Sequence, residues 1–185
     1  MHNTFIFIIF AVFTKYIMMV VPKIYIAKCS KSSDGSYVAG ETIEIQEHFK
    51  GAYYNAIEGL ESYGKPKNYT EKYAEAKSSD VFFPKETVYE ENDVSIKLYF
   101  FDIDNHKNED EAIKAISDSY HAFVDYISGS YIKFWDNIRK RKVMLAYQEA
   151  TKVDKDTLHG IIYKSVTFKF KNVFGRSFSI DDDIF

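Results

Sequence analysis

The two most regular patterns in the sequence are alternations of apolar and polar residues. In residues 161–174, "IIYKSVTFKFKNVF", the side chains of Val166, Phe168 and Phe170 fall on one face, and polar side chains fall on the other. Residues 94–101, "VSIKLYFF", alternate in the same way. Successive side chains of a β-strand point to opposite faces. Both segments are therefore predicted to be strands with one buried face.

Four other short segments are predicted to be strands, with turn residues between them. They are "KIYIAKC" (23–29), "ETIEIQEHF" (41–49), "YIKFWDN" (131–137) and "VMLAYQEA" (143–150). Clusters of small, polar or charged residues predict turns at "SKSSDGS" (30–36), "IRKRK" (138–142) and "DKDTLHG" (154–160). The last two of the four strands should form one hairpin around the basic turn.

One segment between these strands has the period of a helix. From Ala112 to Ile127 apolar residues recur every three or four positions, which predicts an amphipathic helix over about residues 108–128. Asn108 is a suitable N-cap, and the acidic residues that follow it lie where the helix dipole favours anions. Gly129 is expected to end the helix.

Together these elements predict the α+β class. We expect a mostly antiparallel β-sandwich or barrel with one flanking amphipathic helix, because the helix must bury its apolar face against another element. A chain of 185 residues is long enough for one domain with a substantial core. We therefore predict a single β-rich domain over residues 20–185, and residues 1–19 are considered separately.

Residues 51–79 have no clean period. They contain three Gly, one Pro and five Tyr, which predicts a long, structured surface loop. Loops of this length inside a compact domain are usually functional, often at an interface. The alternative is an excursion that lies on its own domain. If the loop is an interface, its tyrosines are the candidate subunit-interface residues, namely Tyr53, Tyr54, Tyr63, Tyr69 and Tyr73.

Residues 1–19 form an apolar leader with three interpretations. The run "NTFIFIIFAVF" has the length of a signal peptide, but no Lys or Arg precedes it and no small-x-small cleavage site follows it. A mis-assigned start is the second interpretation, since Met18 and Met19 directly precede a strand-like segment. The third is an arm that binds a partner. A lipoprotein would carry its lipid on Cys29, where the preceding Lys28 fits poorly.

Composition and charge exclude several classes of protein. Apolar residues make up 46% of the chain, so it is not disordered, and aromatic residues make up 17%. The net charge of -3 is too weak to indicate a nucleic acid or an acidic membrane surface as partner. A single cysteine excludes an intrachain disulfide framework.

No residue pattern predicts catalysis, a cofactor or a metal. The five histidines lack metal-site spacing, and the sequence contains no nucleophile elbow, phosphate loop or dinucleotide fingerprint. "DIDNHKNEDE" has Asp102 and Asp104 at the first two positions of a calcium loop. It has Lys107 where that loop requires Gly and Ile113 where it requires Glu. An acidic helix entrance explains these residues better.

The basic run at residues 139–142 lies next to Trp135, the only tryptophan. Single-strand binding would need exposed aromatic side chains beside a basic track. By strand alternation one of Phe134 and Trp135 must face the core. We expect Trp135 to anchor the hairpin in the core while the basic tip faces solvent or an acidic neighbour. No specific nucleic-acid binding is predicted.

The order of these segments resembles the structural proteins of tailed-phage tails. It consists of the strand pair "VFFPKETVYEENDVSIKLYFF", the helix "AIKAISDSYHAFVDYISG", the hairpin "YIKFWDNIRKRKVMLAYQEA" and the strand "SVTFKFKNVFG". The succession is similar to tube, terminator and distal-tail members found in phages and prophages, and it covers roughly residues 40–175. The N-terminal apolar run departs from that family.

The resemblance implies a virion protein that is assembled in the host cytoplasm and has no active site. Its partners would be copies of itself in a ring and neighbouring tail or connector proteins, through head-to-tail contacts and sheet edges. No membrane partner is expected unless residues 1–19 are a true anchor. The alternative is an exported or lipid-anchored binding protein of the cell envelope, and an enzyme comes third.

Overall fold

We describe the fold from a computed structural model. The residues described are 23–67, 69–71, 80–82, 87–104, 106, 108–158, 161–182 and 185. The predicted leader at residues 1–19 lies outside them.

The described elements are ten strands and two helices. In chain order they are β1 (Ile24–Lys31), β2 (Tyr37–Glu44), α2 (Ile45–His48), β3 (Ala52–Glu58), β4 (Tyr69–Glu71), β5 (Asp80–Phe82), β6 (Asn92–Phe101), α3 (Glu109–Ile127), β7 (Tyr131–Asp136), β8 (Arg141–Leu158), β9 (Ile161–Asn172) and β10 (Phe178–Ser179). The main sheet is antiparallel and has the strand order β2-β1-β7-β8-β9-β6-β3, with β10 paired to β8. Strands β4 and β5 pair only with each other.

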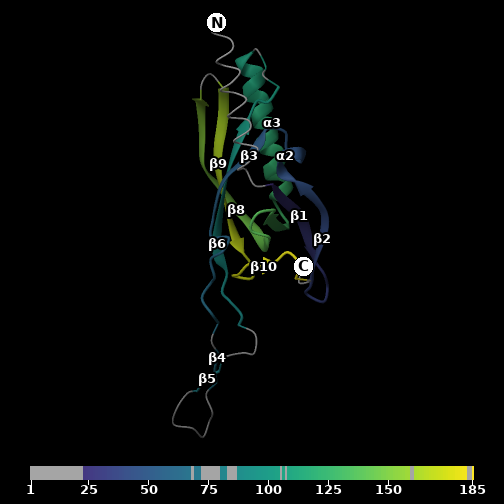
Figure 1. Ribbon diagram of the computed structural model, residues 1–185, viewed down its shortest axis with the longest axis vertical. Coiled ribbons are helices and arrows are strands. Elements are labelled where there is room, and N and C mark those ends of the chain that lie inside the picture. Colours follow the sequence, from purple (N-terminus) through teal and green to yellow (C-terminus); the bar gives the residue numbers. More distant parts are fainter. Residues whose placement is uncertain are drawn as a thin grey trace.

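The sheet is open (Figure 1). Buried residues from several of its strands, from β1 across to β6, pack together with α3 in one apolar core. Ile26 of β1 and Phe134 of β7 belong to the same buried cluster as Phe168 of β9. On α3, the ring of Phe123 lies 4.9 Å from that of Phe168 and 5.2 Å from that of Phe49. The predicted α+β class, mostly antiparallel with one flanking amphipathic helix, is confirmed. The described strands of the main sheet form one open sheet, however, and not the sandwich or barrel that we expected.

Helix α3 begins and ends where its sequence predicts. The Asn108 side chain accepts a hydrogen bond from the backbone N–H of Asp110, 3.0 Å away. Gly129 follows the helix with φ +71°, a conformation that glycine adopts without strain. The two ends of the helix are therefore set largely by residues close to them in the sequence.

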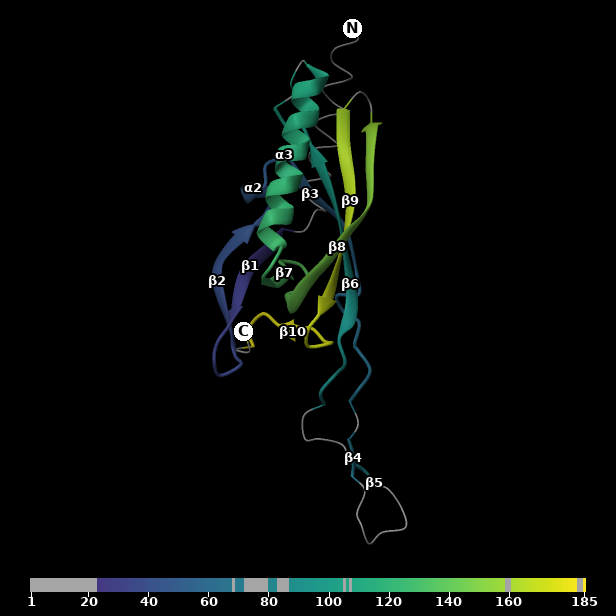
Figure 2. The same ribbon diagram turned by 180° about the vertical axis from the view of Figure 1, so that it is seen from behind.

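The predicted loop at residues 51–79 is partly wrong. Ala52–Glu58 form strand β3 at one edge of the sheet. Asn55 is an extra residue between the pairs Tyr54–Leu98 and Ala56–Lys97, and this bulge interrupts the period of two that would predict a strand. Beyond β3 the chain runs out in a long hairpin that carries β4 and β5 and returns as β6 (Figures 1 and 2).

The boundaries of two predicted elements also differ from those in the structure. The turn at 154–160 begins too early, because β8 continues to Leu158 and pairs there with Ile161. Backbone pairing with β9 outweighs the polar composition of this segment. The strand at 41–49 ends at Glu44, where the short helix α2 begins.

Candidate subunit-interaction surfaces

The hairpin that projects from the sheet has a well-paired base, formed by residues 59–67 and 87–91. The backbone N–H of Lys67 donates to the carbonyl of Val88 at 2.7 Å, and that of Glu90 donates to the carbonyl of Lys65 at 2.8 Å. Asn92 then joins this hairpin base to β6, since its amide nitrogen lies 3.4 Å from the carbonyl oxygen of Gly59.

A second loop fixes the hairpin base to the sheet. The backbone N–H of Gly64 donates to the carbonyl of Gly175 at 2.6 Å. A Cβ atom added at Gly64 would lie 1.8 Å from the Glu90 carbonyl oxygen, and one at Gly175 would lie 1.9 Å from the same oxygen. Three backbone segments can meet this closely only where two of them carry no side chain. The hairpin therefore leaves the sheet in a defined direction.

The hairpin base presents large apolar side chains to solvent. Tyr63 is 56% exposed and Val88 45% exposed. The Tyr63 ring lies 5.2 Å from the ring of Tyr89, and the Arg176 guanidinium lies over the Tyr89 ring at 5.9 Å. Exposed apolar groups on a rigid projection are a typical feature of protein–protein contact surfaces.

The five tyrosines predicted for an interface lie in three kinds of position. Tyr53 is half-buried in β3, with its ring 5.6 Å from that of Phe101. Tyr54 is also half-buried, and burial raises the pKa of its phenol, which hydrogen-bonds to Arg139. Tyr63 is the exposed one. Tyr73 and the side chain of Tyr69 lie outside the described residues.

The two edge strands of the main sheet, β2 and β3, both have a bulge. In β2, Gly40 and Glu41 lie opposite the single residue Lys28 of β1. Bulges interrupt the row of backbone groups that an added strand would need. Each edge therefore offers only short runs for pairing with another chain, although Val38 of β2 is 57% exposed.

The prediction of a solvated basic tip is correct for half of the run: Arg139 and Lys140 are exposed, whereas Arg141 is half-buried and Lys142 is buried. Lys142 is 2% exposed, and its ammonium donates to the carbonyl of Asp182. The Arg141 guanidinium donates to the Ser177 carbonyl at 2.7 Å, and that of Arg139 pairs with the buried Asp136 at 2.8 Å. The C-terminal segment folds back over this part of the sheet and accepts hydrogen bonds from Arg141 and Lys142, which sequence spacing does not reveal.

Trp135 does not anchor the core. Phe134 is 1% exposed in the shared core, whereas Trp135 is half-buried on the opposite face and stacks on Tyr25 at 5.5 Å. Strand alternation required one of the two residues to face inward but did not decide which.

Asp102, Asp104 and His106 are the one group of possible metal ligands among the described residues. His106 Nδ1 lies 2.8 Å from Asp102, and the backbone N–H groups of Asp104 and His106 donate to the same carboxylate. The Lys50 ammonium bonds to Asp104 at 2.6 Å. Burial opposes ionisation of Asp102, but the hydrogen bonds from His106 outweigh it and lower the pKa of this carboxyl. These contacts form a capped turn at the entrance to α3.

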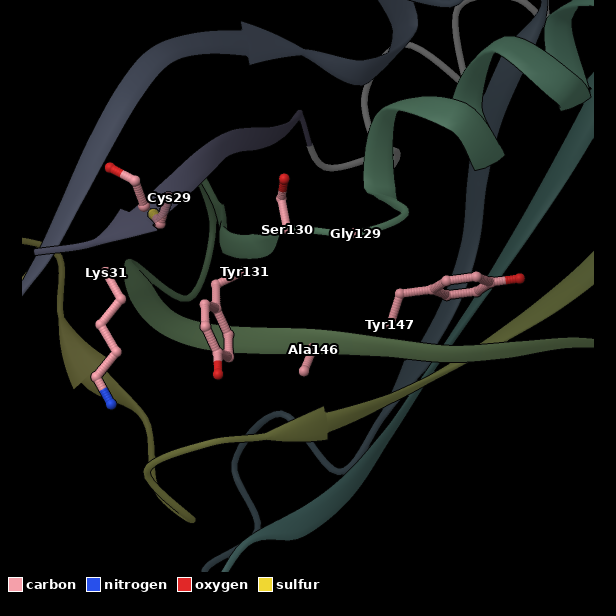
Figure 3. Close-up of a pocket in the computed structure, with 8 residues that line it drawn as sticks. Cys29, Lys31, Gly129, Ser130, Tyr131, Ala146 and Tyr147 are labelled. Carbon is pink, nitrogen blue, oxygen red and sulfur yellow. The ribbon is translucent and has the colours of Figure 1, made fainter.

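Two hollows lie beside α3. One, of about 530 Å³, lies where the helix ends and includes Cys29, Lys31, Tyr131 and Tyr147 (Figure 3). Cys29 is 5% exposed and burial raises the pKa of its thiol, so it is a poor nucleophile. The other, about 290 Å³, lies between α3 and residues 101–104.

The fold is similar to those of phage hub and baseplate proteins. The Dit protein of SPP1, described as a hub of the adsorption apparatus in phages that infect Gram-positive hosts, is 9% identical with a TM-score of 0.47, over 84% of this chain and 52% of that one. A chain of the phage P2 baseplate in its activated conformation is 14% identical with a TM-score of 0.39. That match covers 80% of this chain and 44% of the baseplate chain. This chain thus spans about half the length of each. No family model and no curated protein matches it.

No described helix is both long and apolar enough to cross a membrane.

Proposed function

We propose that this chain is a structural protein of a phage or prophage virion, in the tail or at the head–tail connector. It forms rings through subunit–subunit contacts and performs no catalysis. Its partners are copies of itself and neighbouring tail or connector proteins, and it carries no specific nucleic-acid site. The two similar solved structures are of this class, one a phage hub protein and the other a phage baseplate.

The hairpin base carries this proposal. Tyr63 and Val88 are large side chains left exposed on a projection that backbone contacts hold at a fixed angle, a position that suits contact with a partner. A rigid projection also loses little conformational freedom on binding, which favours assembly. The order of strands, helix and hairpin, on which the sequence resemblance rests, supports the same role.

The lipid-anchored alternative conflicts with strand β1. A lipoprotein begins at its modified cysteine, so a mature chain that started at Cys29 would lack residues 24–28. Ile24 and Ile26 are each 1% exposed in the shared core and would be lost. Removing two large core side chains costs on the order of several kcal/mol, which a domain of this size would not tolerate.

The test is made on particles released from the source cells and separated on a density gradient. We expect the chain to band with tail-containing particles, and peptide mass spectrometry identifies it and its first residue. A cell-envelope protein would instead appear in the membrane fraction. Recovery there with a lipid on Cys29, and absence from particles, would overturn the proposal.

A further inference from the structure

The main sheet carries a row of aromatic and basic side chains on the face opposite the shared core. Strand pairing places Phe178 of β10 opposite Lys142 of β8, and Lys142 opposite Trp135 of β7. Trp135 in turn lies opposite Tyr25 of β1 and stacks on it at 5.5 Å. Directly opposed residues of antiparallel strands lie on the same face of a sheet. None of the four belongs to the shared core.

At one end of this row the ring of Phe185 lies in a slot. It stacks on the ring of Phe174 at 5.4 Å with an angle of 8° between the planes, and it is nearly perpendicular to the ring of Phe178 at 5.6 Å. The ammonium groups of Lys142 and Lys133 lie over it at 5.1 and 5.9 Å. We call these four residues around Phe185 the aromatic slot. Figure 1 shows β10 and the C-terminal end at the same end of the sheet.

The two lysines of the aromatic slot also hold the main chain of its occupant. The Lys133 ammonium donates to the main-chain oxygen of Phe185 at 2.9 Å, and that of Lys142 lies 3.4 Å from the same oxygen. Lys142 donates to the carbonyl of Asp182 as well. Hydrogen bonds from charged donors are stronger than those between neutral groups. The slot therefore recognises an aromatic side chain and the main-chain oxygen beside it.

The segment that enters the aromatic slot is acidic and apolar. Residues 180–185 are "IDDDIF", with three consecutive aspartates. Its described residues bond to three lysines: the Ile180 N–H donates to the carbonyl of Lys140, and Lys142 and Lys133 donate to carbonyl oxygens of the segment. Opposite charge on segment and sheet favours this pairing over others. An acidic peptide segment with an aromatic residue is therefore the ligand class that fits.

Most of the aromatic slot is fixed by contacts that do not involve Phe185. Phe134 and Val143, which adjoin Lys133 and Lys142 in sequence, are buried in the shared core and hold β7 and β8 in place. Pairing with β8 holds β10. Phe185 is only half-buried and lies outside that core. Loss of its ring should therefore leave the sheet folded and the slot open.

We propose that the aromatic slot is a peptide-binding site, and that it accepts residues 180–185 of a second copy in place of the chain's own. A second copy carries the one segment already seen to fit the slot. Within one chain the segment is tethered close to the slot, at an effective concentration on the order of millimolar. Exchange is therefore expected where copies lie side by side, and for that setting alone the inference rests on the proposed function. Exchange of identical segments joins subunits without new surfaces.

A peptide measures binding to the aromatic slot directly. The full chain with Phe185→Ala has a vacant slot, so the N-acetylated peptide IDDDIF should bind to it and change the fluorescence of Trp135, the only tryptophan. The Lys133 ammonium lies 5.4 Å from the Trp135 ring and 5.9 Å from the Phe185 ring, so this fluorescence responds to the occupant. The wild type should need about tenfold more peptide or more, because its own segment competes.

Three controls isolate the contacts. The peptide IDDDIA lacks the ring and should not bind. Lys133→Met, added to Phe185→Ala, should weaken binding of IDDDIF about tenfold, because it removes the ammonium that bonds to the main-chain oxygen. Lys97→Met, at a half-buried lysine of β6, is the matched control and should leave binding unchanged. Circular dichroism checks that every variant is folded.

Mixing two variants tests the exchange between copies. Phe185→Ala keeps the slot and loses the ring, whereas Lys133→Glu keeps the ring and repels the acidic segment from its own slot. At concentrations where the peptide binds, sedimentation velocity should show a 1:1 dimer in an equimolar mixture. Neither variant alone should associate more than the wild type.

The inference is overturned if the peptide IDDDIF does not bind to the Phe185→Ala variant, or if IDDDIA binds equally well. A mixture of the two variants that stays monomeric overturns the second copy as the occupant. The proposed function has a separate test, since banding with particles is measured on the native chain. Particles that contain the chain, together with a slot that binds no peptide, would leave the virion role standing.

Discussion

At the scale of single residues, the hairpin of β7 and β8 shows how neighbours divide between two faces. Phe134 points into the core between the sheet and α3. Trp135 points to the opposite face, which the C-terminal segment partly covers. Both are large aromatic residues, so their hydrophobicity alone does not distinguish them. The arrangement of the other strands decides which one is buried.

Phe134→Ala should therefore destabilise the protein by about 3–5 kcal/mol, the usual cost of deleting a buried aromatic ring. Trp135→Ala should cost less than that, because Trp135 is only partly buried and lies outside the shared core. Urea unfolding followed by far-ultraviolet circular dichroism measures both, since this signal does not depend on the tryptophan. Equal losses would mean that Trp135 contributes to the core as much as Phe134.

Asp102 should make the stability of the protein depend on pH. Its folded pKa is lowered, so its contribution is fully present above the unfolded value of about 3.9 and is lost as the pH falls through the folded value. Between about pH 5 and pH 3 the wild type should lose more stability than Asp102→Asn, which cannot ionise. Denaturant midpoints of the two proteins across this range give the comparison, and parallel curves would contradict it.

At the scale of elements, the hairpin base depends on two glycines for different reasons. Gly64 has an ordinary φ but lies against the carbonyl of Glu90, whereas Gly175 combines that contact with φ +63°. Gly35, in the turn between β1 and β2, has φ +87° with open space around it. The pair Gly175 and Gly35 therefore separates the cost of close approach from the cost of backbone conformation.

Gly35→Ala should cost about 1–2 kcal/mol, the strain of a left-handed residue with a Cβ atom. Gly175→Ala should cost a further 1–3 kcal/mol or so, because the Glu90 carbonyl must move. Hydrogen exchange should accelerate at the amides of Gly64, Lys67 and Glu90 in the second variant only. Equal stability of the two variants would show that the hairpin base does not need this contact.

At the scale of the whole molecule, the chain is an open sheet from which the hairpin base projects at one end of β6 (Figure 1). The bulges in β2 and β3 limit simple addition of strands at the edges. Contacts made by side chains, such as the exposed Tyr63 and Val88 of the hairpin base, avoid that limit.

The sequence by itself determined the elements whose residues lie close together in the chain. Helix α3 follows from its apolar period, its Asn108 cap and Gly129, and strand β9 follows from the alternation of Val166, Phe168 and Phe170. These signals are local, because capping and face alternation act over a few residues. The α+β class and the resemblance to tail proteins follow from the order of such elements.

Only the tertiary structure decided the features that join distant residues. The hairpin base is fixed where Gly64 meets Gly175, more than a hundred positions later, and Lys142 is buried because Asp182 lies over it. Strand β3 exists because β6 pairs with it across a bulge. The stabilising free energy of these contacts comes from backbone pairing and burial between segments that meet only when the chain folds. Patterns within a few neighbouring residues therefore do not encode it.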